Sequence, residues 1–295
     1  ISTWNLFNGD AGTITSSGSI TADGWLSNRG DLTITATGSL DTSHNFDNYG
    51  TLDIAGTWNH TGKMIGTVEV GTVRNHGTMT NSGTVSNSGT FHNYGTVNNE
   101  GTILGDGEYT QFSGLTLNNG VIDSPFLAFS AGTLSGGGLI TGDVTFGAGA
   151  SLEPGDGVGT LTIEGSLWSY GDLYFEIAGR GMGEFDILSI GGPATFYGHQ
   201  GGTAHFAFIG GIEATAGDYW DFLFADSING WDSLCYSFDG LSAGLGWEFI
   251  DLNGQGMRLL IHDDSAPPVP EPSTILLFGG AGAIAFLRWR RRKRA

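Results

Sequence analysis

Cysteine and positive charge are both scarce in this chain of 295 residues, which has 1 Cys and 11 Lys or Arg against 30 Asp or Glu. Cys235 cannot form an internal disulfide, which excludes a cysteine-stapled fold and a Cys-rich zinc domain, and we expect it to be a buried small hydrophobe. The 52 glycines are about one residue in six, too few for the one in three that a collagen triple helix requires.

The few basic residues are concentrated at one end of the chain. Residues 272–295 hold six Lys or Arg and no acid, whereas residues 1–271 hold 5 basic and 30 acidic residues and therefore a net charge of −25. A body this acidic repels phosphate backbones, so nucleic acid is not an expected partner. The chain is still 39% hydrophobic and 12% aromatic, which is enough to build a core.

A six-residue repeat dominates the sequence. Glycine occurs at every sixth position from Gly71 to Gly107, and an apolar or aromatic residue stands two places after each of these glycines. Asn stands two places before the middle five, so the unit reads Asn-x-Gly-Thr-apolar-x. The asparagines are Asn75, Asn81, Asn87, Asn93 and Asn99. Glycines follow the same period in other phases between residues 12 and 183, and we interpret the phase changes as short insertions at corners.

This repeat predicts an all-β parallel β-helix, or β-solenoid. Glycine at this frequency disfavours a helix, whereas Thr and Val favour strands, and Gly and Asn tolerate the positive φ that a tight corner demands. Three hexads would form a triangular coil of roughly 18 residues. Asn75 would then lie over Asn93 and Asn81 over Asn99 as amide ladders, with Met79 over Val97 in the core. A flexible linker is the alternative, but it gives no reason for apolar residues at one fixed phase.

We divide the chain into four segments. Residues 1–183 form the hexad-repeat solenoid, and residues 184–262 form β structure that either continues it or caps its end. Residues 263–272 form a proline-rich spacer, and residues 273–295 form a hydrophobic helix followed by a basic tail. Ile1 has no Met or signal-like segment around it, so either a signal peptide has been removed or the start is missing.

Three unlike features follow one another at the carboxyl end. The first is the motif Val269, Pro270, Glu271 and Pro272. The second is an uncharged stretch that includes Ile275, Leu276, Leu277, Phe278, Ile284, Phe286 and Leu287. The third is a basic cluster formed by Arg288, Arg290, Arg291, Arg292, Lys293 and Arg294. As a helix the uncharged stretch spans about 20 Å, short for a hydrocarbon core of roughly 30 Å, and the basic cluster should remain in the cytoplasm while the body lies outside.

This order of features resembles the PEP-CTERM sorting signal of exported bacterial proteins. The resemblance covers Val269 to Ala295 and implies recognition by an exosortase, a membrane-embedded processing enzyme, with removal near Pro-Glu-Pro. It also implies a transient stay in the inner membrane and an exported, cell-surface or extracellular protein in a bacterium that makes exopolysaccharide. A permanent tail anchor is the alternative.

The body resembles an autotransporter passenger region over residues 70–250. The segments in that style are residues 154–161, 165–167 and 185–188. This resemblance implies that the β-helix is right-handed.

Candidate catalytic groups are few, so we expect no catalytic residues, no cofactor and no metal site. The hexads from residue 71 to 107 contain only Glu100, Asp106 and Arg74 as charged groups of interest. The acids beside His262 adjoin the spacer and are expected to be solvated. In an 18-residue coil His76 stacks with Tyr94 and Arg74 with His92, a column that could contact sugar rings or a partner.

We therefore expect a non-enzymatic structural or adhesive protein, an adhesin of the cell surface or matrix whose partners include exopolysaccharide or other surface proteins. The alternative is a polysaccharide lyase or hydrolase. Converging carboxylates with an Arg or Lys would favour that enzyme.

Overall fold

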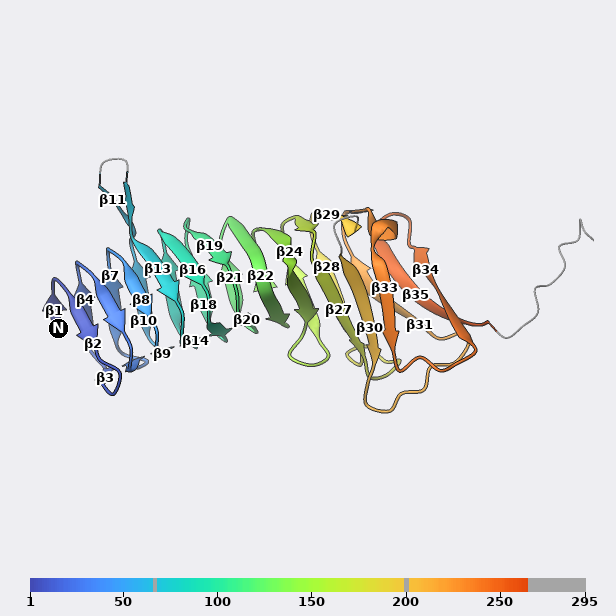
Figure 1. Cartoon of the computed structure of the whole chain (residues 1–295), viewed down its shortest axis with the longest axis horizontal. Helices are drawn as coiled ribbons and strands as arrows, with labels where there is room; N and C mark the ends of the chain where they lie inside the picture. The colour runs from blue at the N-terminus through green and yellow to red at the C-terminus, as the bar shows by residue number, and fades with distance from the viewer. Residues whose placement is uncertain (66–67, 199–201, 265–295) are drawn as a thin grey trace, which may run out of the picture.

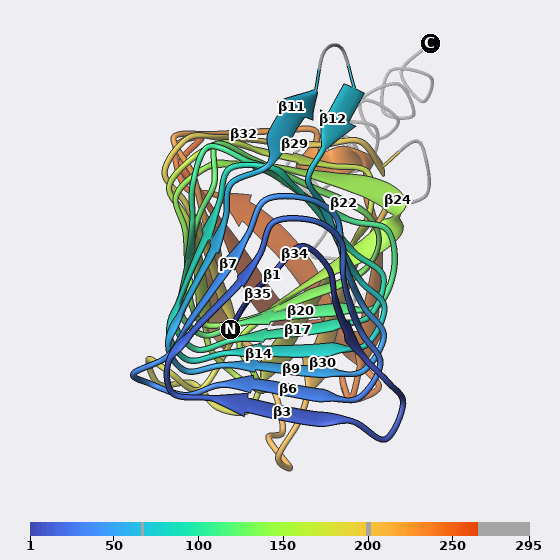
Figure 2. The same cartoon turned by 90° about the vertical axis from the view of Figure 1, so that its left-hand side faces the viewer.

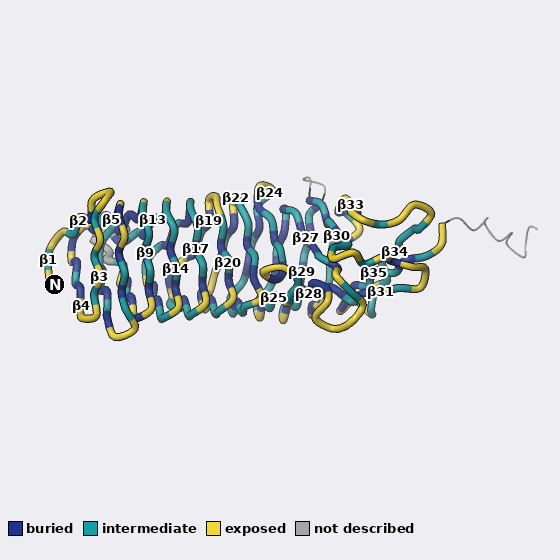
Figure 3. Tube along the Cα trace, turned by 90° about the horizontal axis from the view of Figure 1, so that it is seen from below, coloured by how far each residue is buried: buried dark blue, intermediate teal, exposed yellow. Residues whose placement is uncertain are grey.

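Each hexad of the repeat forms one short strand. The computed structural model describes residues 1–65, 68–198 and 202–264. In Thr84–Asn87 the apolar Val85 and the amide Asn87 are buried, whereas Thr84 and Ser86 are half-buried. Buried and exposed residues alternate in this way along most of the chain (Figure 3). Period-two burial is what a β-strand with one face toward a core requires.

The strands stack as three parallel faces of a solenoid (Figure 1). The first face contains β1 (Ser2–Thr3), β4 (Ser19–Ala22), β7 (Ser39–Thr42), β10 (Thr57–His60), β15 (Thr84–Asn87), β18 (Thr102–Leu104), β21 (Val121–Asp123), β23 (Leu139–Ile140), β25 (Thr160–Ile163), β28 (Ile187–Ile190) and β31 (Tyr219–Phe224). The second contains β2 (Leu6–Asn8), β5 (Leu26–Asn28), β8 (Phe46–Asn48), β13 (Thr72–Asn75), β16 (Thr90–Asn93), β19 (Glu108–Gln111), β26 (Leu167–Ser169), β29 (Pro193–Phe196) and β32 (Ser227–Asn229).

The third face contains β3 (Thr13–Ser16), β6 (Asp31–Ile34), β9 (Thr51–Ile54), β14 (Thr78–Asn81), β17 (Thr96–Asn99), β20 (Leu115–Asn118), β27 (Asp172–Ile177), β30 (Thr203–Phe208) and β33 (Cys235–Asp239). Two long strands, β22 (Phe126–Gly136) and β24 (Asp143–Pro154), turn the corner between the second and third faces. They pair with each other through a register shift between Phe129 and Ala131. A bulge of this kind lets one strand bend.

The pairing register confirms the predicted coil and the predicted fold. Met79 lies beside Val97, and Asn75 lies beside Asn93 in the neighbouring coil. Asn75 Nδ2 donates to Asn93 Oδ1 at 2.9 Å. The chain is therefore an all-β parallel solenoid with amide ladders, while its hand stays a prediction.

One predicted corner insertion is a hairpin. β11 (Lys63–Ile65) and β12 (Val68–Val70) pair antiparallel and project from the solenoid between β10 and β13 (Figure 1). The coil that carries them is longer than its neighbours, since Asn48 pairs with Asn75. The stacking of the second face continues past the insertion because the hairpin leaves from a corner.

The predicted positive φ at the corners occurs at the first repeat glycine, Gly71, whose φ is 137°, and is wrong for the other six. Gly77, Gly83, Gly89, Gly95, Gly101 and Gly107 have no positive φ, and among the described residues the one non-glycine that does is Asn253. Glycine is needed at these corners because the coils stack closely. A Cβ on Gly95 would lie 2.2 Å from the carbonyl oxygen of Gly77 in the preceding coil.

The carboxyl-terminal region both continues and caps the solenoid. β28, β30 and β33 add parallel strands, and then β35 (Gly256–Asp263) pairs antiparallel with β31 and with β34 (Leu245–Asp251). A short 3-10 helix, η2 (Trp231–Ser233), packs beside β29. β35 reaches Asp263, one residue into the range predicted as spacer. At the amino-terminal end, β1, β2 and β3 each pair on one side only among the described strands (Figure 2).

Candidate functional site

The aromatic column predicted on the surface is present and is longer than predicted. The rings of His76 and Tyr94 are stacked 4.7 Å apart, and Tyr49 and Phe112 extend the column at 4.9 and 5.1 Å. These near-parallel rings cover one another's faces, which leaves their edges to solvent. Arg74 lies beside His92 as expected, with its guanidinium bonded to Asp47 Oδ1 at 3.3 Å. The column therefore stabilises coil stacking more than it offers a flat binding surface.

Cys235 is exposed, so the prediction of a buried cysteine is wrong. It begins β33 and pairs with Thr203, which is half-buried, while the next residue, Tyr236, pairs with the buried Ala204. Strand alternation places the aromatic ring toward the core and the thiol toward solvent.

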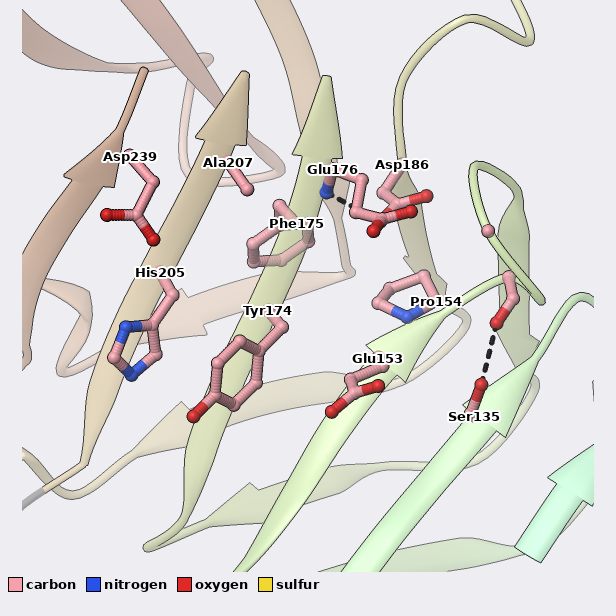
Figure 4. A pocket seen from close by; sticks show the side chains of 12 residues that line it. Ser135, Glu153, Pro154, Tyr174, Phe175, Glu176, Asp186, His205, Ala207 and Asp239 are labelled. Atoms are coloured by element: carbon pink, nitrogen blue, oxygen red, sulfur yellow. Dashed lines mark hydrogen bonds between the residues drawn. The ribbon is translucent and has the colours of Figure 1, made fainter. Parts of the chain in front are cut away.

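A cleft of about 200 Å³ on the third face is the candidate site that the sequence did not reveal. Its acidic side chains are Glu153, Glu176, Asp186 and Asp239, joined by Tyr174 and His205 (Figure 4). They come from β24, β27, β30, β33 and the loop after β27. These residues span almost 90 positions in irregular coils outside the hexads. No fixed spacing in the sequence therefore predicted that they lie together.

Outward positions of adjacent strands build one side of the cleft. Tyr174 pairs in register with His205, and their rings stack at 4.3 Å with an angle of 9°. His205 Nδ1 is hydrogen-bonded to the Ser237 hydroxyl. Glu153 follows Leu152, which pairs with Leu173, so its side chain lies next to Tyr174 along the same face (Figure 4). The aromatic pair thus forms a firm wall beside the carboxylates.

Asp186 ties the loop to the sheet at the base of the cleft. It is 2% exposed, and its carboxylate accepts hydrogen bonds from the backbone N–H groups of Gly159 at 2.8 Å and Glu176 at 2.7 Å. Burial raises the pKa of Asp186 to about 7, against the lowering effect of these two donors, and the charges of Glu176 and Glu153 add to the rise. Both carboxylate oxygens of Asp186 therefore hold backbone in place at the cleft.

The half-buried Glu153 is the carboxylate better placed to meet a ligand. Burial raises its pKa, and the negative charge of Glu176 raises it further. Burial also raises the pKa of Tyr174, together with the charges of Asp172 and Glu153. No Lys or Arg lines the cleft, and among the described residues no group of three metal-binding side chains could hold an ion. The cleft therefore disfavours anionic ligands.

Beyond the cap, residues 268–293 match the family model described as the PEP-CTERM protein-sorting motif. The chain carries a PEP-CTERM sorting signal. This signal is recognised by exosortase, a processing enzyme, and implies an exported protein of the cell surface. No curated protein matches the chain.

The predicted sorting residues lie outside the described part of the chain. This holds for the motif at 269–272, the apolar stretch at 275–287 and the basic cluster at 288–294. Within the described residues, no helix is long and apolar enough to cross a membrane.

Proposed function

We propose that this protein is a structural and adhesive element of the cell surface or extracellular matrix, and that it acts without catalysis. The observation that supports this proposal best is the unbroken amide ladder inside the rod. It runs from Asn8 through Asn28, Asn48, Asn75 and Asn93 to Gln111, with each Nδ2 donating to the next side-chain oxygen at 2.8 to 3.2 Å. Such a ladder holds successive coils in register and makes the body a stiff spacer.

The sorting signal follows the cap, so the amino-terminal coils would point away from the site of attachment. The acidic body suits hydrated polymers and cations better than nucleic acid or anionic lipid. Exopolysaccharide and other surface proteins are therefore the partners we propose.

The test compares host cells that produce the full chain, the chain without residues 268–293, or neither. We expect the full chain in the surface fraction and a cohesive matrix, and we expect both to be lost without the signal. Normal matrix cohesion in cells that lack the protein would contradict the structural role.

We also propose that the signal is removed after translocation. Mass spectrometry of surface protein from the native host should find a carboxyl terminus before Arg288. A mature protein that still carries Arg288 to Ala295 would instead indicate a permanent anchor.

A second candidate function is hydrolysis of a neutral glycan in the acidic cleft. The presence of Glu153 and Glu176 in one cleft favours it, because glycoside hydrolysis uses a pair of carboxyl groups, and burial with the charge of Glu176 raises the pKa of Glu153. A lyase fits less well, since no Lys or Arg in the cleft could neutralise a uronate. Reducing-end release from neutral polysaccharides that disappears in Glu153→Gln, but persists in Glu108→Gln on β19, would establish this activity. If the unmodified protein released no reducing ends, the structural and adhesive role would be the function that remains.

A further inference from the structure

Two tryptophans are exposed in the amino-terminal coils of the solenoid. Trp4 is 66% exposed and Trp25 is 51% exposed. They flank a hollow of about 290 Å³ that is also lined by Asn5, Gly24, His44 and Asn45. Large exposed apolar surface of this kind is unfavourable in water unless a ligand or partner covers it, so it marks a candidate binding site.

The corner that carries these tryptophans is well ordered by hydrogen bonds. Trp25 N–H donates to Asn5 Oδ1 at 2.7 Å, and its indole Nε1 donates to Asp47 Oδ2 at 2.9 Å. Trp4 extends along the solenoid axis, with its ring 5.6 Å from His44 two coils away. A Cβ on Gly24 would lie 2.9 Å from Trp4 Nε1, so the glycine lets the indole lie close to the backbone. The hollow is therefore formed before any ligand arrives.

The ring faces here are open, unlike those of the aromatic column on the surface. In the column of Tyr49, His76 and Tyr94 the rings are nearly parallel and cover each other. Trp4 meets His44 at a tilt of 56°, and within the described residues Trp25 has no ring stacked on it. An indole face without a neighbour can take a flat ligand surface directly.

The polar side chains around the hollow are two amides and the imidazole of His44. Asn45 Oδ1 accepts from the backbone N–H groups of Gly71 and Thr72, as Asn5 Oδ1 does from Trp25. With both oxygens fixed by the backbone, the Nδ2 groups of Asn5 and Asn45 are the donors that these side chains can offer a ligand. None of the six lining residues is an acid, a Lys or an Arg.

We propose that this hollow binds a pyranose unit of a neutral polysaccharide. The apolar C–H face of a sugar ring packs on an indole, and its hydroxyl groups match amide donors and acceptors. A nucleobase would also stack, but its phosphates would meet a body with a net charge of −25 over residues 1–271. The inference rests on the proposed adhesive function and identifies the part of the rod that holds the glycan.

Titration of the intact protein with cellohexaose, followed by tryptophan fluorescence, tests the proposal. We expect saturable binding that is unchanged between low and high salt, because the ligand carries no charge. Trp4→Ala and Trp25→Ala should each weaken binding about tenfold. Trp4→Phe and Trp25→Phe keep a ring face and should retain most of the binding affinity. Hexagalacturonate, a negatively charged hexasaccharide, should bind less well.

Phe126→Ala is the matched control because it removes an exposed ring that lines neither the hollow nor the acidic cleft. Circular dichroism and the urea midpoint of each variant show whether it folds. If an Ala variant does not fold, the binding affinity of the Phe variants tests the site instead. Binding that survives loss of both indoles, or that disappears in Phe126→Ala, would overturn this site while leaving the adhesive function standing. No binding of cellohexaose, laminarihexaose or xylohexaose by the unmodified protein would overturn the site, whereas the matrix cohesion test decides the function separately.

Discussion

The hexad coils and the carboxyl-terminal cap solve the same packing problem with different residues. In the hexads each strand buries one apolar side chain, mostly an aliphatic one such as Val85 or Val97, flanked by buried asparagines, and the rings of Phe91 and Tyr109 stack in this core. The cap gathers more rings in one cluster, where the ring centroid of Phe206 lies 5.0 Å from that of Phe222 and 5.5 Å from that of Phe249. Its last strands are antiparallel, whereas those of the hexads are parallel.

The hexad coils and the cap bury different residues because a hexad coil has a neighbouring coil on each side along the solenoid axis, whereas the last coil does not. A coil inside the repeat meets an identical coil, so a side-chain amide finds another amide and every donor meets an acceptor. The last coil has no such neighbour, and a buried amide there would lose its partner. Aromatic rings and a reversed strand close the end without requiring a continuing ladder.

The largest effect should come from breaking the aromatic cluster of the cap. Phe206 is 1% exposed and lies between several rings. Phe206→Ala should lower the free energy of unfolding by about 3 to 5 kcal/mol, because it leaves a cavity that the rings cannot fill. Urea unfolding measures this. Phe126→Ala, at a side chain that is 44% exposed, is the control, and equal losses in both variants would show that the cluster does not hold the cap.

The next effect should come from the amide ladder. Asn93 is fully buried, accepts from Asn75 Nδ2 and donates to Gln111 Oε1. Asn93→Ala should cost about 2 to 3 kcal/mol, since it removes partners from buried polar groups. Asn98→Ala, at a half-buried position of the next strand, should change stability by less than about 0.5 kcal/mol. A neutral result at Asn93 would mean that apolar packing alone sets the register.

A smaller effect is expected at the tight corners. Gly95→Ala should cost about 1 to 2 kcal/mol because its Cβ would press on the preceding coil. Gly18 also has an ordinary φ, but nothing lies within 4 Å of its Cβ position. Gly18→Ala should therefore be neutral or slightly stabilising. Thermal unfolding of the two variants distinguishes steric packing from backbone flexibility, since flexibility alone predicts similar results.

The smallest effect should come from an ion pair of the cap. The Arg180 guanidinium holds the pKa of Asp218 at about 2, below its ordinary value. A lowered folded-state pKa stabilises the fold above about pH 4, and this contribution is lost as the pH falls toward 2. Arg180→Ala should thus shift the urea midpoint slightly at pH 7 and not at pH 2. Arg29→Ala is the control, because the ion pair of Arg29 with Asp10 is highly exposed, and it should leave the urea midpoint unchanged at both pH values. If Arg180→Ala shifted the midpoint at pH 2 as well, Arg180 would stabilise the cap by packing and not by its charge.

The regular coils could be predicted because the repeat carries its own register. Once three hexads close one coil, the partners of Asn75 and Met79 follow from counting. The cleft could not be predicted in this way, since Glu153, Tyr174 and His205 come from coils of unequal length. The exposure of Cys235 depends on the same irregular register, and one residue of shift exchanges inside for outside.

The sequence by itself determined the period, the strand stacking and the presence of a sorting signal, because each is encoded in short segments that repeat or follow in fixed order. Only the tertiary structure decided why glycine stands at the corners, how the cap closes the core and where the acidic cleft and the tryptophan hollow lie. These features arise where residues distant in sequence approach within a few ångströms, and their spacing depends on loop lengths that no local pattern records.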